Sequence, residues 1–236
     1  DVGASFLERC RLILAEVEAA DNLAAESQSA PRGLLRKNAP VTFGSTSLAA
    51  ALPDYLRAHP EVSVDLTITD RMVDLVDEGF DAVIRIGELA DTSLRARATT
   101  PYEMVLCGAL SYLTGPAPPQ RPQDLTTHAC LGFAHWLPRN QWHFAGSEGA
   151  RTVEVQGPLT VNMGYALRVA ALAGLGIILQ PQILLQDDIE QGLLVQLMSQ
   201  WRHAARPMHI LTAQDGRRTR RLGSFVDFIA QRSPPR

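Results

Sequence analysis

The chain of 236 residues contains little cysteine and carries little net charge. Its three cysteines, Cys10, Cys107 and Cys130, lie far apart and form no CxxC pair. This argues against a disulfide framework and against structural zinc, and it fits a reducing compartment. The net charge of −3 excludes a chain that binds nucleic acid mainly by neutralising phosphates.

Long apolar runs and targeting signals are also missing. No uninterrupted apolar stretch is long enough to span a membrane, and the N-terminus lacks the basic and apolar regions of a secretory signal. We therefore expect a cytoplasmic protein. The first residue is Asp1 rather than methionine, so we expect a fragment of a longer chain. The basic run 217–221 is interpreted as a solvated helix face, or as a local contact with DNA or a partner domain.

Signatures of enzymes and metal sites are absent as well. The chain has no HExxH, no P-loop and no G-x-S-x-G around Ser45 or Ser147. His135 and His143 are eight residues apart without a cysteine or acidic partner at metal spacing. We predict no catalytic residues, no metal and no cofactor.

Residues 5–26 are predicted to form one amphipathic helix. Its apolar positions step by four and three, which is a heptad seam of Phe6, Cys10, Ile13, Val17, Ala20 and Ala24. A helix of this kind needs a partner, so we predict that it crosses to a second subunit. Packing on its own globular body is the alternative. A linker at 27–33 follows.

Strand and helix patterns then alternate, which predicts an α/β fold. In the first half we expect strands at 34–43, 62–67 and 82–86, helices at 48–57 and 71–78, an extended segment at 93–98, and a turn with a helix N-cap at 44–47. In the second half we expect strands at 103–107, 129–133, 141–144, 151–161, 177–179 and 193–197, helices at 163–173, 181–190 and 218–231, and an extended segment at 206–212. Two similar units joined by crossing strands at 99–106 and 205–212 would enclose a hinged cleft.

One block is especially informative: DLVDEGFDAVIRIGELADTSLRARA, residues 74–98. It resembles a recurring string in the effector-binding domain of LysR-type transcriptional regulators. The order and spacing of further short matches extend the resemblance over nearly all of the chain. They include PVTFG at 40–44, TDR at 69–71, PQDL at 122–125, ALAGLGI at 171–177, GLLV at 192–195 and FVDF at 225–228. The Ala109-Leu110-Ser111 turn departs from the Ser-Pro that family members often carry before Tyr112.

The resemblance implies two Rossmann-like subdomains of the periplasmic-binding-protein type II kind, preceded by a long linker helix. It divides the chain into a linker and dimerisation helix at 1–30, subdomain I at 34–100 plus 212–236, and subdomain II at 101–211. It also implies a small-molecule effector, a homodimer or homotetramer, no membrane association, and DNA binding through an N-terminal winged helix-turn-helix that this chain does not include.

Effector-binding residues are expected where strands end at the cleft. Ser45, Thr46 and Ser47 lie between a strand and a helix N-terminus, which suits an anion; plain N-capping is the alternative. Arg85 could hold a carboxylate, or pair with Asp70, Asp81 or Glu88. The remaining candidates are Thr69, Cys107, Phe133, Asn162 and Gln180. Asn162 could be a simple cap, and Cys107 could be an inert buried thiol or a redox sensor.

Two other functions share this scaffold. A solute-binding protein of a transporter is disfavoured by the missing signal sequence and by the seam helix. An enzyme such as a deaminase or dehydratase is disfavoured because no acid/base or metal constellation can be assembled. A small anionic or aromatic effector in the cleft therefore remains the main hypothesis.

Overall fold

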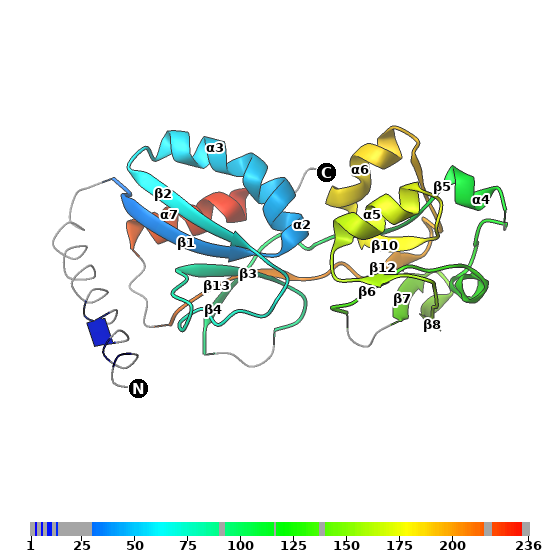
Figure 1. The fold of residues 1–236 in the computed structure, drawn as a ribbon, viewed down its shortest axis with the longest axis horizontal. Coiled ribbons are helices and arrows are strands. Elements are labelled where there is room, and N and C mark those ends of the chain that lie inside the picture. Colours follow the sequence, from blue (N-terminus) through cyan, green and yellow to red (C-terminus); the bar gives the residue numbers. More distant parts are fainter. Residues whose placement is uncertain are drawn as a thin grey trace.

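Two α/β lobes lie side by side in the computed structural model, and two chain segments join them (Figure 1). The structure describes residues 30–89, 93–115, 117–136, 140–214 and 219–232, together with Gly3, Phe6, Arg9, Cys10 and Ile13. Those five isolated residues are helical, and Phe6 and Ile13 are exposed. The rest of the predicted seam helix lies outside the described residues, so its pairing stays a prediction.

The first lobe is built on a five-stranded sheet in the order β2-β1-β3-β13-β4. The strands are β1 (Gly33–Ala39), β2 (Val62–Ile68), β3 (Ala82–Ile86), β4 (Arg95–Ala98) and β13 (Met208–Thr212). β1 runs parallel to β2 and β3, whereas β13 is antiparallel to β3 and β4. Its helical segments are α2 (Val41–Phe43), η1 (Gly44–Leu48), α3 (Ala49–Ala58) and α7 (Arg220–Gln231). α3 packs on α7 through Tyr55, whose ring meets Phe225 edge-on at 5.4 Å.

The predicted strand at 34–43 and the turn at 44–47 are corrected by the structure. Pro40 ends the strand and precedes a helix that runs from Val41 through a π-helical turn into α3. The hydroxyls of Ser45 and Thr46 donate to the carbonyls of Val41 and Thr42, each at 2.7 Å. Both side chains therefore bond to the preceding helical turn and do not cap a helix N-terminus.

Two further local predictions are wrong. Residues 71–78 do not form a helix: 71–74 are irregular and 75–79 form turns, where the carboxylate of Asp74 accepts from the amides of Val76 and Asp77 at 2.8 and 2.9 Å. This local bonding competes with helix formation. The N-cap of the helix after Asn162 is Met163, and no side chain caps it.

The second lobe is arranged around β5. One sheet has the order β10-β5-β11, a second has β12-β7-β8, and β6 pairs with β9. Its strands are β5 (Met104–Ala109), β6 (Gly132–Phe133), β7 (Gln141–Gly146), β8 (Gly149–Glu154), β9 (Thr160–Val161), β10 (Ile178–Pro181), β11 (Leu194–Gln196) and β12 (Arg202–His203). Its helices are α4 (Leu110–Leu113), η2 (Pro122–Thr127), α5 (Gly164–Leu172) and α6 (Gln182–Glu190).

The chain crosses between the lobes twice, once between β4 and β5 and once between β12 and β13. The crossings pair at Tyr102 and Arg206, as the sequence predicted for segments 99–106 and 205–212. β13 belongs to the sheet of the first lobe, so the second crossing lies before Met208. The subdomain boundaries stay predictions.

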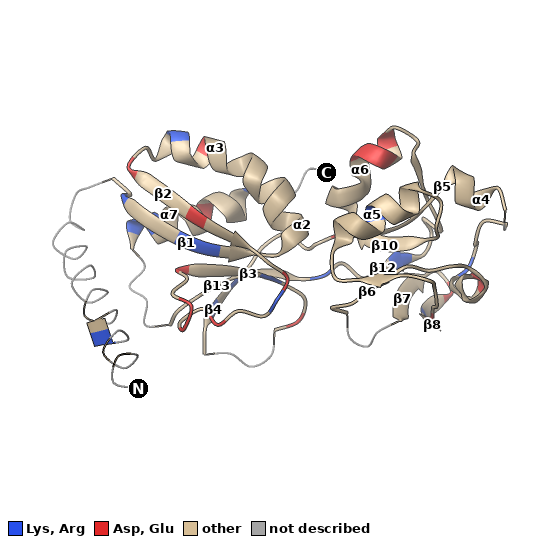
Figure 2. Ribbon diagram, in the orientation of Figure 1, with Lys and Arg blue, Asp and Glu red and all other residues tan. Residues whose placement is uncertain are grey.

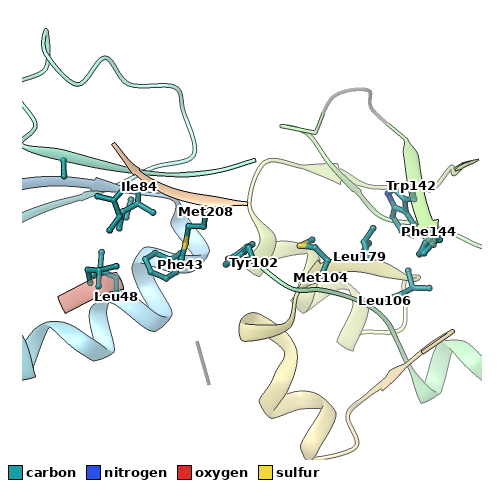
Figure 3. Close-up of a cluster of buried hydrophobic side chains, with 14 of the residues drawn as sticks. Phe43, Leu48, Ile84, Tyr102, Met104, Leu106, Trp142, Phe144, Leu179 and Met208 are labelled. Carbon is teal, nitrogen blue, oxygen red and sulfur yellow. The ribbon is translucent and has the colours of Figure 1, made fainter. Parts of the chain in front are cut away.

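One buried hydrophobic cluster extends through both lobes (Figure 3). Phe43 and Met208 of the first lobe and Met104 and Leu179 of the second belong to it, and Tyr102 lies between them. The contact between the lobes is therefore an apolar core around the crossings. Of the helices that the structure describes, none has the length and apolarity that crossing a bilayer requires.

Candidate functional site

A cavity of about 230 Å³ opens between the lobes, and its walls come from both lobes and both crossings. The first lobe contributes the residues where β1, β2 and β3 end. The second contributes the end of β10 and the segment after β6. Ligands of open α/β sheets bind at such carboxyl ends of strands, so the position fits a small-molecule site.

A helix N-terminus forms part of the first wall. Pro40 and Thr42 line the cavity at the start of α2, and the first amides of a helix have no partner within it. Asp70 accepts the Val41 amide at 2.9 Å. Thr69, beside it, accepts the Arg71 amide at 3.3 Å. The positive end of the helix therefore has one carboxylate beside it, and Thr42 lines the cavity at that end.

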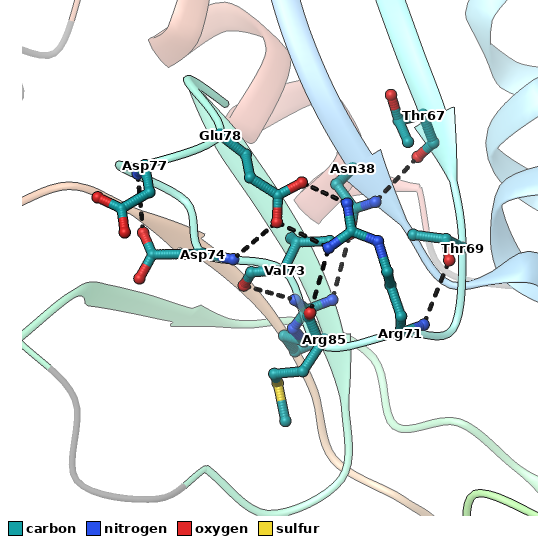
Figure 4. Close-up of polar contacts among 10 residues, drawn as sticks. Asn38, Thr67, Thr69, Arg71, Val73, Asp74, Asp77, Glu78 and Arg85 are labelled. Atoms are coloured by element: carbon teal, nitrogen blue, oxygen red, sulfur yellow. Dashed lines mark hydrogen bonds and ion pairs between the residues drawn. The ribbon is translucent and has the colours of Figure 1, made fainter. Parts of the chain in front are cut away.

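Arg85 lies at the end of β3 and is half-buried (Figure 4). Its guanidinium donates to the Asn38 amide oxygen at 3.2 Å and to the Val73 carbonyl at 3.1 Å. Burial lowers the pKa of Arg85, and the charge of Glu78 partly offsets this effect. Both hydrogen-bond acceptors are neutral, so the salt bridges that the sequence left open do not form.

The neighbouring carboxylates are engaged elsewhere. Glu78 forms a two-pronged ion pair with Arg71 (Figure 4). Asp81 accepts the backbone amide of Arg36 at 2.7 Å. Arg71 is thereby neutralised locally, while Arg85 keeps a charge that no carboxylate among the described residues pairs with directly.

The two crossing segments, which form the hinge between the lobes, contribute Tyr102 and Arg206. Their backbones exchange two hydrogen bonds, Tyr102 N to Arg206 O at 2.7 Å and Arg206 N to Tyr102 O at 2.9 Å. Both side chains line the cavity. Burial raises the pKa of Tyr102, and the nearby Thr42 hydroxyl offsets only part of the shift. Burial also lowers the pKa of Arg206.

The second lobe supplies an aromatic wall. Phe133 and Trp136 meet edge-on with ring centroids 5.9 Å apart, and the Arg206 guanidinium lies 5.6 Å from the Trp136 centroid. His135 and the buried Gln180 complete this side. The wall is thus mainly apolar, with one amide and one cation at its border.

Among the predicted residues, Thr69, Arg85, Phe133 and Gln180 line this cavity. The others do not line it: Ser45, Thr46 and Ser47 lie within the helix, Asn162 is exposed, and Cys107 is fully buried in the second lobe. Burial raises the pKa of the Cys107 thiol to about 12, so little thiolate forms at neutral pH. Roles for these five residues in effector binding stay predictions.

The cavity is also lined by four residues that were not predicted from the sequence: Thr42, Tyr102, Trp136 and Arg206. Tyr102 and Arg206 lie near the middle of the predicted crossings, and that position was a usable signal. Trp136 directly follows His135, which the sequence offered only as a metal ligand. Within the described part of the chain, no three His, Cys, Asp or Glu side chains gather where they could hold a metal ion.

Two lobes, paired crossings and a cavity at the hinge define a two-lobed ligand-binding domain of the periplasmic-binding-protein type II kind. The family model "LysR substrate binding domain" matches residues 28–234, and the chain belongs to this family of transcriptional regulators. The winged helix-turn-helix of such regulators lies outside this match.

Sequence relatives and solved structures agree with this family assignment. The chain is 30% identical over 230 residues to the HTH-type transcriptional regulator YhjC of Escherichia coli K12, covering 97% of this chain and 77% of the relative. It is 31% identical over 212 residues to the transcriptional activator AaeR of the same organism, covering 89% and 68%. CrgA from Neisseria meningitidis matches with a TM-score of 0.77 and 26% identity over 98% of this chain and 79% of CrgA. AphB of Vibrio cholerae shares the fold, with a TM-score of 0.79 and 22% identity over 98% and 79%.

Proposed function

We propose that this chain is the effector-sensing part of a LysR-type regulator and binds a small anionic molecule in the cavity between the lobes. The observation that carries the proposal is the pair Arg85 and Arg206. Both guanidiniums are partly buried beside one cavity, and neither has a carboxylate partner among the described residues. A buried charge is costly unless it is compensated, and an anionic ligand would compensate both.

The ligand would act by shifting populations. The lobes would adopt two relative positions, and a molecule that contacts both lobes and the hinge would bind more tightly in one of them. The population of that position then rises by an amount set by the difference in affinity. The linker helices would pass this preference to DNA-binding domains encoded before this chain. Lys and Arg are interspersed with Asp and Glu over both lobes (Figure 2). Because the net charge of this chain is −3, we propose that DNA is bound through a separate N-terminal domain, in a cytoplasmic homodimer or homotetramer.

A solute-binding protein and an enzyme remain the competing functions. The family match supports a regulator over both. A domain that releases its ligand chemically unchanged supports a sensor, whereas turnover of a bound carboxylate would support an enzyme. Pairing of the chain in solution by sedimentation supports a regulator, and a monomer would favour a solute-binding protein.

The Arg85→Gln variant tests the proposal. A thermal-shift screen of small carboxylates, phenols and phosphates first identifies a ligand, whose affinity is then measured by calorimetry. We expect Arg85→Gln to weaken that ligand about tenfold or more, because a charge-assisted bond is lost. Arg57→Gln, in an exposed ion pair on α3, is the matched control. Equal affinity in Arg85→Gln and Arg57→Gln would remove Arg85 from the site.

A second test compares the ligand affinities of variants at Thr42 and Thr46, which lie about one helical turn apart. The sequence places Thr46 in the site, whereas Thr42 is the residue on the cavity wall. We expect Thr42→Val to weaken the same ligand about fivefold through loss of one hydroxyl, and Thr46→Val to leave it unchanged. Calorimetry with both variants decides between them. Weakening by Thr46→Val alone would restore the sequence-based assignment.

A further inference from the structure

The two crossing segments bring a phenol and a guanidinium to the same place. Tyr102 and Arg206 are directly opposed in an antiparallel pair and exchange both backbone hydrogen bonds. Opposed residues of such a pair project their side chains to the same face and have Cα atoms about 5.5 Å apart. The hinge therefore holds two polar side chains next to each other, and both line the cavity.

Among the described residues, neither side chain has a carboxylate or a well-placed hydrogen-bond acceptor. The Tyr102 hydroxyl is buried and forms no hydrogen bond of good geometry in the described structure, where the Thr42 hydroxyl is its polar neighbour, and the residue is only 7% exposed. The Arg206 guanidinium is packed between the Trp136 ring and Gly87, where a Cβ would come within 3.3 Å of its Nη2. Gly87 has a φ of +113°, so a side chain there would be strained as well as crowded. A buried hydroxyl without a partner is unfavourable, and its O–H can be satisfied by an acceptor from a ligand.

The surrounding wall restricts the shape of that ligand. Trp136 and Phe133 offer flat aromatic surfaces beside Arg206, and Ile86 and Met104 add apolar contact. The cavity volume of about 230 Å³ is small for a ligand pocket and leaves space for about one ring with a short substituent. Asp70 also lines the cavity at the start of α2, close enough to Tyr102 for its charge to raise the pKa of that phenol, and its carboxylate accepts the Val41 amide.

We infer that Tyr102 and Arg206 form a carboxylate clamp at the hinge, and that the ligand is a single-ring aromatic carboxylate whose ring lies against Trp136. One carboxylate oxygen accepts from the Tyr102 hydroxyl and the other from the Arg206 guanidinium. This inference rests on the proposed function and deepens it. The acid group would be held by the segments about which the lobes move, so binding and the lobe position would be coupled at one point.

The test uses the chain of residues 1–236 and matched probes in calorimetry. Benzoate, 4-hydroxybenzoate, salicylate and cinnamate represent the inferred class. Benzamide lacks the charge, cyclohexanecarboxylate lacks the aromatic ring, and acetate lacks the ring altogether. We expect at least one aromatic carboxylate to bind about tenfold or more tightly than its amide and its saturated analogue, and acetate to give no measurable binding.

Variants locate the carboxylate. We expect Arg206→Gln to weaken the aromatic carboxylate by about 10- to 100-fold while the amide is unaffected, so that discrimination between them is lost. Arg206→Lys should retain most of that discrimination because it keeps the charge. Tyr102→Phe should weaken the carboxylate about fivefold to tenfold with little effect on the Tm of the unliganded chain, because the hydroxyl forms no hydrogen bond of good geometry in the described structure. Arg95→Gln, on the exposed strand β4, is the control.

The possible failures are distinguishable. If a ligand is lost in Arg85→Gln but keeps its affinity and charge preference in Arg206→Gln and Tyr102→Phe, the hinge clamp is wrong and the proposed site stands. If the ligand found is a phosphate or an uncharged molecule, the inferred class is wrong. If the ligand is unaffected by all three variants, the cavity is not its site and the proposed function fails too. A purely structural role for Arg206 would weaken carboxylate and amide equally.

Discussion

Replacing Lys37 with methionine is expected to stabilise the folded chain by about 4 kcal/mol at pH 7. Lys37 lies on β1 with 1% of its surface exposed, and its amine has no hydrogen-bond partner among the described residues. The Nζ atom lies 4.8 Å from the centroid of the Phe225 ring, below α7. Burial lowers the pKa of Lys37 from 10.5 to about 7, Asp81 opposes this shift, and Arg221 adds to it.

The lowered pKa of Lys37 makes the stability of the folded chain depend on pH. Between pH 7 and 10.5 the unfolded state binds a proton at Lys37 that the folded state has lost. Stability therefore rises with pH across this window, and it is independent of this group below pH 7, where both states are protonated. The advantage of Lys37→Met should shrink as the pH is raised towards 10.5.

Urea unfolding of both proteins at pH 7 and at pH 9.5 measures this difference. Arg36→Met is the matched control, since Arg36 is the preceding residue and its side chain is half-exposed beside Asp65. A Lys37→Met chain that is less stable than the parent at pH 7 would mean that the buried amine is compensated in the folded state. A difference that does not change with pH would exclude titration of Lys37 as the cause.

Replacing Arg168 with methionine is expected to destabilise the chain by about 3 kcal/mol. Arg168 on α5 bonds through Nη2 and Nε to both carboxylate oxygens of Asp188 on α6, and the Asp188 side chain is only 2% exposed. Without the guanidinium, the buried carboxylate keeps its desolvation cost and loses its partner. The loss should therefore exceed that of a surface ion pair, which is typically below about 1 kcal/mol.

Chemical denaturation with a double-mutant design separates the pair from the packing. Asp188→Leu in the Arg168→Met background removes the unpaired charge and should recover most of the lost stability. Arg57→Met, whose partner Asp54 is exposed, is the control. Equal losses in Arg168→Met and Arg57→Met would show that the α5–α6 ion pair contributes no more than a surface pair.

The sequence predicted those elements whose own pattern decides their structure. β2, β3 and α3 lie within a residue or two of the predicted bounds, because alternation and helical spacing were clear there. The strand before Pro40 was extended too far, and the helix at 71–78 was wrong. Pro40 ends the strand and Asp70 accepts the Val41 amide at the start of the helix, whereas at 71–78 Asp74 accepts two amides of its own turn. Such bonds depend on where side chains meet and are not visible as periodicity.

The sequence predicted only part of the candidate site. Thr69, Arg85, Phe133 and Gln180 were found because they follow strands whose carboxyl ends share one edge. Tyr102 and Arg206 were missed because their side chains reach the cavity only through the register of two segments distant in sequence. Thr42 was missed because the helix begins at Val41 and not at Leu48, which moved the helix N-terminus by about two turns.

The buried cluster that extends through both lobes limits how this domain can move. A large opening of the lobes would expose Phe43, Tyr102 and Met104 to water, at about 25 cal/mol for each Å² of apolar surface. Small rotations that slide these rings past one another avoid most of this cost. The chain should therefore transmit its state through slight changes in tilt, and scattering profiles with and without ligand should be nearly superimposable.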